Sequence, residues 1–266
     1  MAENKLKIFK LGGNVIDNNQ ELENFLENIS KISEDKILIH GGGKIANKYL
    51  KKLGIEPRMH EGRRITDEAT LEVVTMVYAG LINKKIIASL QKFGCDAVGL
   101  SGCDGDVIRT TKRKKESIDF GFVGDPDEKS VNADFLSLLL SSRLTPVINS
   151  INHDGQGNLL NTNADTLAYF VANSLAEIYS AELYVCFEKP GVLENVNEND
   201  SVIKNINFAK YQRLIEEKKI DEGMLPKLKA AFETLNSKVK KVVICSASDV
   251  FDVAEGLTTK GTVIEL

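Results

Sequence analysis

Two glycine-rich turns are the first stretches of this sequence whose residue types suggest chemistry. The stretch Lys36-Ile-Leu-Ile-His-Gly-Gly-Gly-Lys44 has a short apolar run, typical of a buried strand, which breaks on three glycines and continues at helical spacing. The N–H groups at the start of such a helix have no partners within it, and with the helix dipole they favour an anion. A second apolar run ends in the same way, at Gly12 and Gly13.

Lys10 lies inside that second apolar run, two residues before Gly12. A lysine in a buried strand is rare unless its charge is paired, so we expect its ammonium to reach a site at the end of the strand. Ligands of open α/β sheets bind at the carboxyl ends of the strands. Either glycine turn alone could serve only to reverse the chain, so the prediction depends on the turns and the lysine converging.

A third polar cluster, Asn161-Thr-Asn-Ala-Asp165, stands at the head of a predicted helix. Asparagine and aspartate are favoured helix caps, but one cap needs only one such residue. We therefore expect the two amides to hold a small polar molecule. Asp165 is then placed to accept hydrogen bonds from lysines and to orient them.

Basic residues elsewhere in the chain fit an anionic ligand. Lys227 follows Pro226 at a predicted helix start, where a cation opposes the dipole by about 0.3–1 kcal/mol, so it either faces a polyanion or is simply solvated. Arg63 and Arg64 are adjacent and point differently, so we expect one of them to bind a carboxylate and the other to lie on the surface.

Several familiar catalytic patterns are missing from the sequence. There is no Ser-His-Asp arrangement, no P-loop (Ile45 follows Gly43-Lys44) and no G-x-G-x-x-G motif. With three histidines, we expect no metal site built from protein side chains. What remains is electrostatic stabilisation without covalent catalysis, which is what phosphoryl transfer requires.

Composition narrows the class of protein further. The 266 residues are 42% hydrophobic, with a net charge of −4, which argues against a nucleic-acid-binding surface. No apolar run approaches the ~18 residues of a membrane span, and the four cysteines form no C-x-x-C pair. We expect a cytoplasmic protein with reduced thiols.

Strand and helix patterns alternate along the chain, which predicts an α/β fold with a central, mainly parallel sheet. Predicted strands cover residues 6–11, 37–39, 97–100, 146–148, 182–187, 241–245 and, as a sheet edge, 262–266. Predicted helices cover residues 21–32, 44–53, 67–93 (one helix, or two with a break at Gly80), 132–140, 164–175, 208–218 and 225–235. Thr66 is the expected N-cap of the third helix, and residues 107–123 are expected to form a polar hairpin.

These motifs, in this order, resemble the amino acid kinase family and, within it, the acylglutamate kinases. The matching pieces are Lys10-Leu-Gly-Gly13, His40-Gly-Gly-Gly43, Gly62-Arg-Arg-Ile-Thr66, Asn161-Thr-Asn-Ala-Asp165 and Gly223-Met-Leu-Pro-Lys227. The resemblance implies an open three-layer αβα sandwich. It also implies an N-terminal lobe, residues 1–180, that binds acylglutamate and forms a homodimer, and a C-terminal lobe, residues 181–266, that binds ATP.

The resemblance also implies roles for single residues. Lys10 and Lys227 would stabilise the transferring phosphoryl group, and Asp165 would orient both. Gly12, Gly13 and Gly43 would donate backbone hydrogen bonds to the ATP phosphates, and Gly42 and Gly43 would also border the substrate. Arg64 and Asn161 would bind the substrate's α-carboxylate, with Asn163 nearby. Mg2+ would be held mainly by the nucleotide's own oxygens.

The implied reaction is ATP-dependent phosphorylation of the side-chain carboxylate of N-acetyl-L-glutamate, or of another N-acyl-L-glutamate such as N-succinyl, in arginine biosynthesis. A carboxylate is already ionised at neutral pH, so no general base is needed. The alternatives are another acceptor (carbamate, UMP or glutamate) and a non-catalytic sensor of a nucleotide or metabolite.

Two features leave details open. Phe187-Glu-Lys-Pro-Gly-Val-Leu193 stands where the family usually has Thr-Asp-Val-Pro-Gly-Val-Leu, so Glu188 would carry its charge to the nucleotide one methylene further out. The acyl group has no readable signature. An acidic acyl end such as succinyl would need an extra cation, for which Arg109 and Lys112 are the candidates.

Overall fold

The computed structural model describes residues 4–265, apart from residues 61, 116, 196, 218, 220–223, 236 and 237. In this part of the chain one eight-stranded sheet has the order β12-β14-β13-β11-β1-β2-β8-β5. Its strands are β1 (Lys5–Leu11), β2 (Asp35–His40), β5 (Ala97–Leu100), β8 (Thr145–Asn149), β11 (Ser180–Phe187), β12 (Asn205–Ile206), β13 (Lys241–Ser246) and β14 (Thr262–Ile264). The sheet therefore runs through both expected lobes without interruption.

The pairing is parallel except between β13 and β14, which confirms the predicted mainly parallel sheet. In the centre, Lys10 lies opposite Val185 of β11 on one side and Ile39 of β2 on the other. The expectation that the last strand is a sheet edge is wrong, because β12 pairs with the outer side of β14. The short segment that forms β12 has too few residues to show a strand pattern in the sequence.

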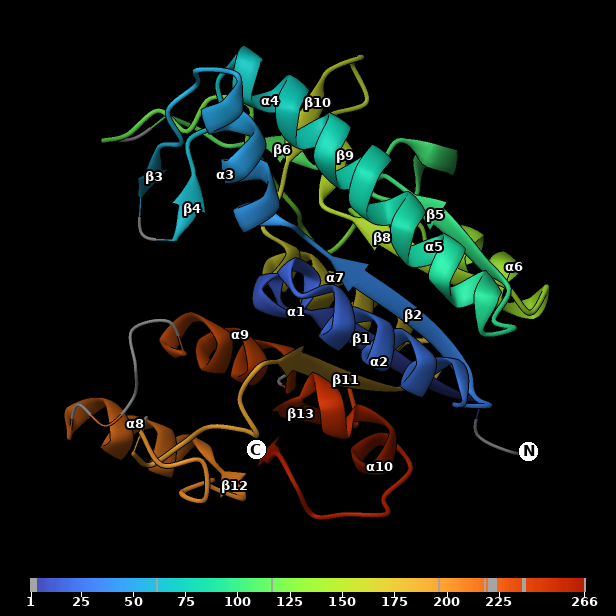
Figure 1. Cartoon of the computed structure of the whole chain (residues 1–266), viewed down its shortest axis with the longest axis vertical. Helices are drawn as coiled ribbons and strands as arrows, with labels where there is room; N and C mark the ends of the chain where they lie inside the picture. Colours follow the sequence, from blue (N-terminus) through green and yellow to red (C-terminus); the bar gives the residue numbers. More distant parts are fainter. Residues whose placement is uncertain are drawn as a thin grey trace.

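Helices cover both faces of the sheet and make the three-layer αβα sandwich (Figure 1). One face carries α6 (Ala133–Ser141), α7 (Ala164–Leu175) and α9 (Leu225–Leu235), with α8 (Phe208–Glu216) beside them. The other face carries α2 (Asn19–Ser30), α5 (Asn83–Lys92) and α10 (Val250–Ala254). The remaining helical segments are α1 (Gly13–Asp17), α3 (Gly43–Lys52), α4 (Glu68–Thr75), the π-helix η1 (Met76–Ile82) and the 3₁₀ turns η2 (Asp104–Asp106) and η3 (Ala247–Asp249).

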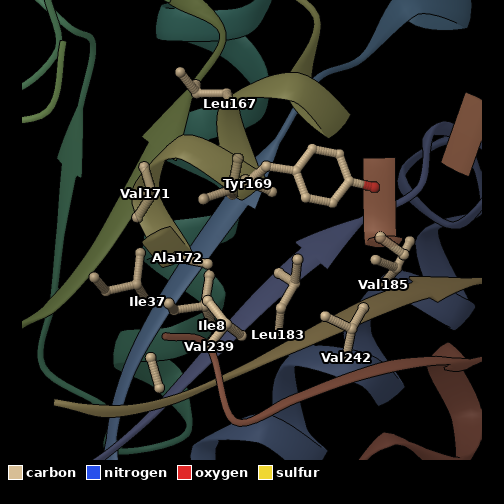
Figure 2. Close-up of a cluster of buried hydrophobic side chains, with 14 of the residues drawn as sticks. Ile8, Ile37, Leu167, Tyr169, Val171, Ala172, Leu183, Val185, Val239 and Val242 are labelled. Atoms are coloured by element: carbon tan, nitrogen blue, oxygen red, sulfur yellow. The ribbon is translucent and has the colours of Figure 1, made fainter. Parts of the chain in front are cut away.

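Alternation along β1 decides which side chains face the site. Leu6 and Ile8 belong to the core beneath α7, where Figure 2 shows Ile8 beside Ala172. Phe9 and Leu11 belong to the core on the opposite face. Because side chains of a strand alternate, Lys10 follows Ile8 on the α7 face and extends toward the N-terminal end of that helix.

Residues 68–92 form one long helix rather than two. Gly80 does not break it; the chain passes instead through the π-helix η1, which α5 continues directly. By length and composition this helix is apolar enough to cross a membrane, but 44% of its most apolar window is buried within the protein. Many of its apolar side chains, including Val74 and Ile86, belong to the core, whereas Met76 is exposed.

Three small two-stranded sheets lie at the edge where β1, β2 and β8 end. They pair β3 (Met59–His60) with β4 (Arg63–Arg64), β6 (Thr111–Lys112) with β7 (Gly124–Asp125), and β9 (Ile151–His153) with β10 (Leu159–Asn161). The hairpin predicted for residues 107–123 is thus reduced to one short ladder, whose second strand begins at Gly124. A hairpin with its turn at Asp154 and Gly155 joins β9 to β10.

Candidate functional site

An ion pair between Lys10 and Asp165 lies at the centre of the candidate site. The Nζ atom of Lys10 is 2.6 Å from Oδ1 of Asp165, and the lysine side chain is only 7% exposed. β1 delivers the lysine and the first turn of α7 delivers the carboxylate, so the two meet where the strand ends against the helix. The pairing explains how a lysine can lie inside an apolar strand.

A first cavity of about 330 Å³ opens on one side of this pair. Its wall includes the three glycines after β2, Arg64, Tyr78 and the polar head of α7. Several residues singled out from the sequence line this cavity, namely the glycine turn, Arg64, Asn161, Asn163 and Asp165.

A second cavity of about 460 Å³ opens on the other side. The two cavities share five lining residues, namely Lys10, Gly13, Gly43, Met59 and Arg64. The second cavity reaches across the sheet to the turn after β11, where Phe187, Glu188, Val192 and Leu193 line it. A group held at the shared wall would face both cavities and the ammonium of Lys10.

Arg64 is the buried cation of the first cavity. Its Nη2 donates to the carbonyl of Gly43 at 3.0 Å, whereas its Nη1 is buried without a hydrogen-bond partner. A buried guanidinium nitrogen that lacks a partner costs free energy, which a bound carboxylate would recover. Of the two adjacent arginines, Arg64 is therefore the one suited to an anion.

Asn161 lines the first cavity beside Arg64 and is hydrogen-bonded to the buried Thr66 behind it. The Nδ2 of Asn161 donates to Oγ1 of Thr66 at 3.1 Å, and that hydroxyl donates to the carbonyl of Arg64 at 3.1 Å. Thr66 is fully buried and does not cap the following helix, so this prediction was wrong. Asp67 is the cap, since its side chain accepts from the N–H of Thr70. The threonine instead links the arginine to the asparagine.

The head of α7 is capped by Asn163, whose Oδ1 accepts from the N–H groups of Asp165 and Thr166. The capping interpretation of this cluster is thus correct for one of its three polar side chains. The other two, Asn161 and Asp165, make different contacts and line the first cavity. Asn163 lines the cavity as well, so the cluster provides one helix cap and three residues of the cavity wall.

The turn after β2 requires glycine at position 42. Gly42 has φ +152°, and a Cβ there would lie 2.1 Å from Cδ1 of Ile82 and 3.3 Å from the ring of Tyr78. Both neighbours belong to the π-helix, a feature that often marks functional sites and that the sequence did not predict. Burial raises the pKa of the Tyr78 hydroxyl, and the charge of Arg64 partly opposes this, so the hydroxyl remains a donor in the cavity wall.

His40 supports the same turn from below and does not line either cavity. Its Nδ1 donates to the carbonyl of Gly41 at 2.9 Å, and its Nε2 accepts from the Asn83 amide at 3.1 Å. Complete burial lowers the pKa of His40 to about 4, so the ring is neutral at pH 7. It is a structural residue rather than a base.

The glycines after β1 differ in the donors that they present. The N–H of Gly12 donates to the carbonyl of Cys186 at 2.8 Å, and a Cβ on Gly12 would lie 3.2 Å from that of Phe187. The N–H of Gly12 is therefore engaged, and this glycine allows the ends of β1 and β11 to approach. Gly13 begins α1 and lines both cavities, as Gly43 does at the start of α3.

Glu188 lies at the far wall of the second cavity, exposed, with its Oε1 accepting from Nδ2 of Asn14 at 2.5 Å. This bond links the turn after β11 to the turn after β1. The backbone of Lys227 lies in the first turn of α9, but its side chain is outside the described part of the structure, as is Gly223. Among the described residues, no three His, Cys, Asp or Glu side chains gather as a metal site.

Neither of the two candidate cations for an acidic acyl group lines the first cavity, although Lys112 lines an outer cavity that adjoins it. Arg109 pairs with Asp106 at 2.5 Å, and Lys112 lies 4.6 Å above the ring of Phe122. The arginines that do line this part of the cavity are Arg63 and Arg113, next to Asp125. Sequence reasoning missed Arg113 because nothing in the run Lys112-Arg-Lys-Lys115 distinguishes one cation from its neighbours.

The geometry defines a protein class: an open αβα sandwich with two adjoining cavities that meet at a buried lysine at the end of the central strand. A family model described as the amino acid kinase family matches residues 5–246. The chain therefore belongs to the amino acid kinase family.

Individual relatives are similar over nearly the full length. Acetylglutamate kinase of Cytophaga hutchinsonii is 47% identical over 259 residues, which cover 97% of each chain. The protein of that name from Bacteroides fragilis is 48% identical over 92% of this chain and 93% of its own, and that from Methanopyrus kandleri is 35% identical over 90% and 94%.

Solved structures share the fold at lower identity. N-acetylglutamate synthase from Neisseria gonorrhoeae, in complex with coenzyme A and N-acetyl-glutamate, superimposes with a TM-score of 0.81 at 18% identity, covering 99% of this chain and 60% of its own. Carbamate kinase from Giardia lamblia bound to AMP-PNP has a TM-score of 0.72 at 16% identity, with coverage of 99% and 98%.

Proposed function

We propose that this protein is an acylglutamate kinase, which uses ATP to phosphorylate the side-chain carboxylate of N-acetyl-L-glutamate or of a related N-acyl-L-glutamate. The observation that carries the proposal is the Lys10–Asp165 pair beside the shared wall of two cavities, one of which contains the unpartnered Nη1 of Arg64. Relatives named acetylglutamate kinase, at 46–48% identity over more than nine-tenths of the chain, support the choice of acceptor.

The proposed acceptor lies in the first cavity with its α-carboxylate on Arg64, near Asn161 and Asn163. Its side-chain carboxylate then faces the shared wall and attacks the γ-phosphorus in line from there. No side chain has to remove a proton, because the nucleophile is an anion at neutral pH. This agrees with the role of His40, the histidine nearest the turn, which is neutral and engaged on both ring nitrogens.

Lys10 stabilises the charge that develops on the transferring phosphoryl group. The backbone N–H groups of Gly13 and Gly43, where α1 and α3 begin, stabilise it as well. Preorganised donors of this kind, in a site that excludes water, are the main source of catalysis in phosphoryl transfer. Asp165 holds the ammonium at 2.6 Å and so fixes its direction. We propose Lys227 as the second ammonium, from the C-terminal lobe.

ATP occupies the second cavity in this proposal. Its phosphates approach the glycine turns, while its base and ribose extend toward the turn after β11, with Glu188 and the apolar side chains Val192 and Leu193 in its wall. Mg2+ is brought by the nucleotide and is held mainly by phosphate oxygens, since the described residues offer no acidic cluster for it.

The proposal extends to the organisation of the protein. Residues 1–180 bind the acceptor and form a homodimer, residues 181–266 bind the nucleotide, and the enzyme works in the cytoplasm in an early step of arginine biosynthesis. The position of the first cavity among loops of residues 41–166, and of the far wall of the second cavity at residues 187–193, supports this division.

A panel of acceptors with ADP release as the readout tests the proposal. N-acetyl-L-glutamate, N-succinyl-L-glutamate, L-glutamate, carbamate and UMP are each supplied with ATP and Mg2+. Turnover of an N-acyl-L-glutamate supports the proposal, and turnover of carbamate or UMP alone overturns it. Tight ATP binding in calorimetry without any phosphorylated product would identify the protein as a sensor.

A further inference from the structure

A third, outer cavity of about 710 Å³ adjoins the first cavity on the side away from the second cavity. The first and outer cavities share Arg63, Arg113 and Asp125. The three cavities therefore form a row, in which the first cavity joins the second at Lys10 and the outer one at these three charged residues. A ligand in the first cavity therefore has one end near Lys10, where the phosphoryl group is transferred, and its other end near Arg63, Arg113 and Asp125.

The described charged side chains that line the outer cavity are mainly basic. Four are cations, Arg63, Lys112, Arg113 and Lys114, and one is an acid, Asp125. Asp125 accepts from Nε of Arg113 at 2.8 Å and is also bonded by Nη2 of the same guanidinium. Arg63 stands 3.9 Å from the same carboxylate. One carboxylate among four cations leaves a positive potential at the junction, where an anion is attracted.

Arg113 is held rigidly at this junction. Its side chain is 16% exposed, its guanidinium lies 4.9 Å from the ring centre of Phe120, and Asp125 fixes one edge of the fork. An arginine oriented in this way loses little conformational entropy when a second carboxylate binds, in contrast to an exposed lysine. The junction therefore resembles a prepared carboxylate site more than a solvated surface.

The composition of the cavity wall at this junction is unsuited to an acetyl group. A methyl group is stabilised by apolar contacts. If it is buried against guanidinium groups, it displaces the water that is hydrogen-bonded to them and offers no hydrogen bond in return. The opening into the outer cavity also leaves room beyond a two-carbon acyl group. An acyl chain that ends in a carboxylate fits both the charge and the space.

We propose that the preferred acceptor is an N-acyl-L-glutamate whose acyl group ends in a second carboxylate, such as N-succinyl-L-glutamate, and that Arg113, with Arg63, determines this preference. The inference rests on the proposed function, because it places the acceptor's side-chain carboxylate at Lys10 and its α-carboxylate on Arg64. The acyl chain is then placed toward Arg113 and Asp125, which line the same cavity.

A comparison of three acceptors tests the inference on the wild-type enzyme. They are N-acetyl-L-glutamate, N-succinyl-L-glutamate and the terminal amide of the latter, which has the same length without the charge. We expect kcat/KM for the succinyl compound to exceed that for its amide by about 10- to 100-fold, the usual effect of one charge-assisted hydrogen bond. It should also exceed that for the acetyl compound, and the advantage should shrink at high salt.

The double variant Arg113→Gln with Asp125→Asn removes the guanidinium without leaving a carboxylate unpaired. We expect it to reduce the ratio of kcat/KM between the succinyl compound and its amide several-fold, while Arg63 keeps part of the preference. Lys115→Gln is the matched control, because Lys115 pairs with the exposed Asp119 and lines none of the three cavities. If the double variant does not fold, the comparison of the succinyl compound with its amide on the wild-type enzyme still tests the preference for a second carboxylate.

The outcomes separate this inference from the function on which it rests. Equal or better use of the acetyl compound, or equal use of the amide, overturns the inference and leaves an acylglutamate kinase. A ratio that stays unchanged in the double variant overturns the role of Arg113. Absence of turnover with every N-acyl-L-glutamate, while ATP binds, overturns the proposed function and this inference with it.

Discussion

Nζ of Lys10 lies 2.6 Å from Oδ1 of Asp165, across the boundary between the central strand β1 and the first turn of α7. The lysine is almost fully buried, and the carboxylate is about one quarter exposed toward the first cavity. Asp165 therefore compensates the buried charge of Lys10 and also fixes the direction of its ammonium group. Since α7 also packs on β1, β2 and β11, the direction of the ammonium is tied to the core of the protein.

Lys10→Met should lower kcat by about 10²- to 10³-fold, because it removes one preorganised donor to the transferring phosphoryl group. Methionine fills a similar volume, so circular dichroism should show an unchanged fold. KM for both substrates should change much less than kcat. ADP release measures the rate, and a variant with near-normal kcat would remove Lys10 from the mechanism.

Arg64→Gln should raise KM for the acceptor by about 10- to 100-fold, since it removes a charge-assisted pair with the α-carboxylate. KM for ATP should change less, because the nucleotide's proposed contacts lie mostly in the second cavity. In the wild type, added acceptor should raise the melting temperature as the Nη1 of Arg64 gains its partner. That shift should be lost in the variant, and a retained shift would contradict the assignment.

Local patterns were sufficient to predict most of the sheet and several of the residues that line the first cavity. The apolar runs that became β1, β2 and β11, the glycine turns after β1 and β2, and the helix at residues 164–175 each carry their signal within a few residues. Lys10 could be assigned to the site because a lysine in such a run needs a partner. The partner itself could be named only because the polar head of α7 exceeded what capping requires.

Features that depend on tertiary contacts were not predictable from the sequence. Thr66 looks like a cap, but burial against Asn161 gives it another partner and leaves Asp67 to cap the helix. Gly80 looks like a break, but its helix is held on both sides by core contacts and changes to a π-helix instead. Arg113 becomes distinct from its basic neighbours only through Asp125, twelve residues further along the chain.

Gly42→Ala should destabilise the protein by about 1–3 kcal/mol, because position 42 has a positive φ and a methyl group there would overlap the buried Ile82. Gly80→Ala is the matched control, with nothing within 4 Å of its added Cβ. In a helix this change should be neutral or stabilising by up to about 1 kcal/mol. Urea unfolding measures both, and equal stability of the two variants would show that the turn is not constrained as described.

His40 should make the protein less stable as the pH falls from about 6.5 toward 4. Burial lowers its pKa from 6.5 to about 4 in the folded protein, so between these values the unfolded chain binds a proton that the folded one does not. Its contribution is therefore complete above about pH 6.5, falls steadily below it, and reaches a loss of order 3 kcal/mol near pH 4. Urea unfolding at several pH values should show this slope in the wild type and a shallower one in His40→Gln, whose amide can replace part of the hydrogen bonding to Gly41 and Asn83 without titrating. An identical slope in the two proteins would mean that other groups cause the acid sensitivity and that the neutral ring does not support the glycine turn in the way described.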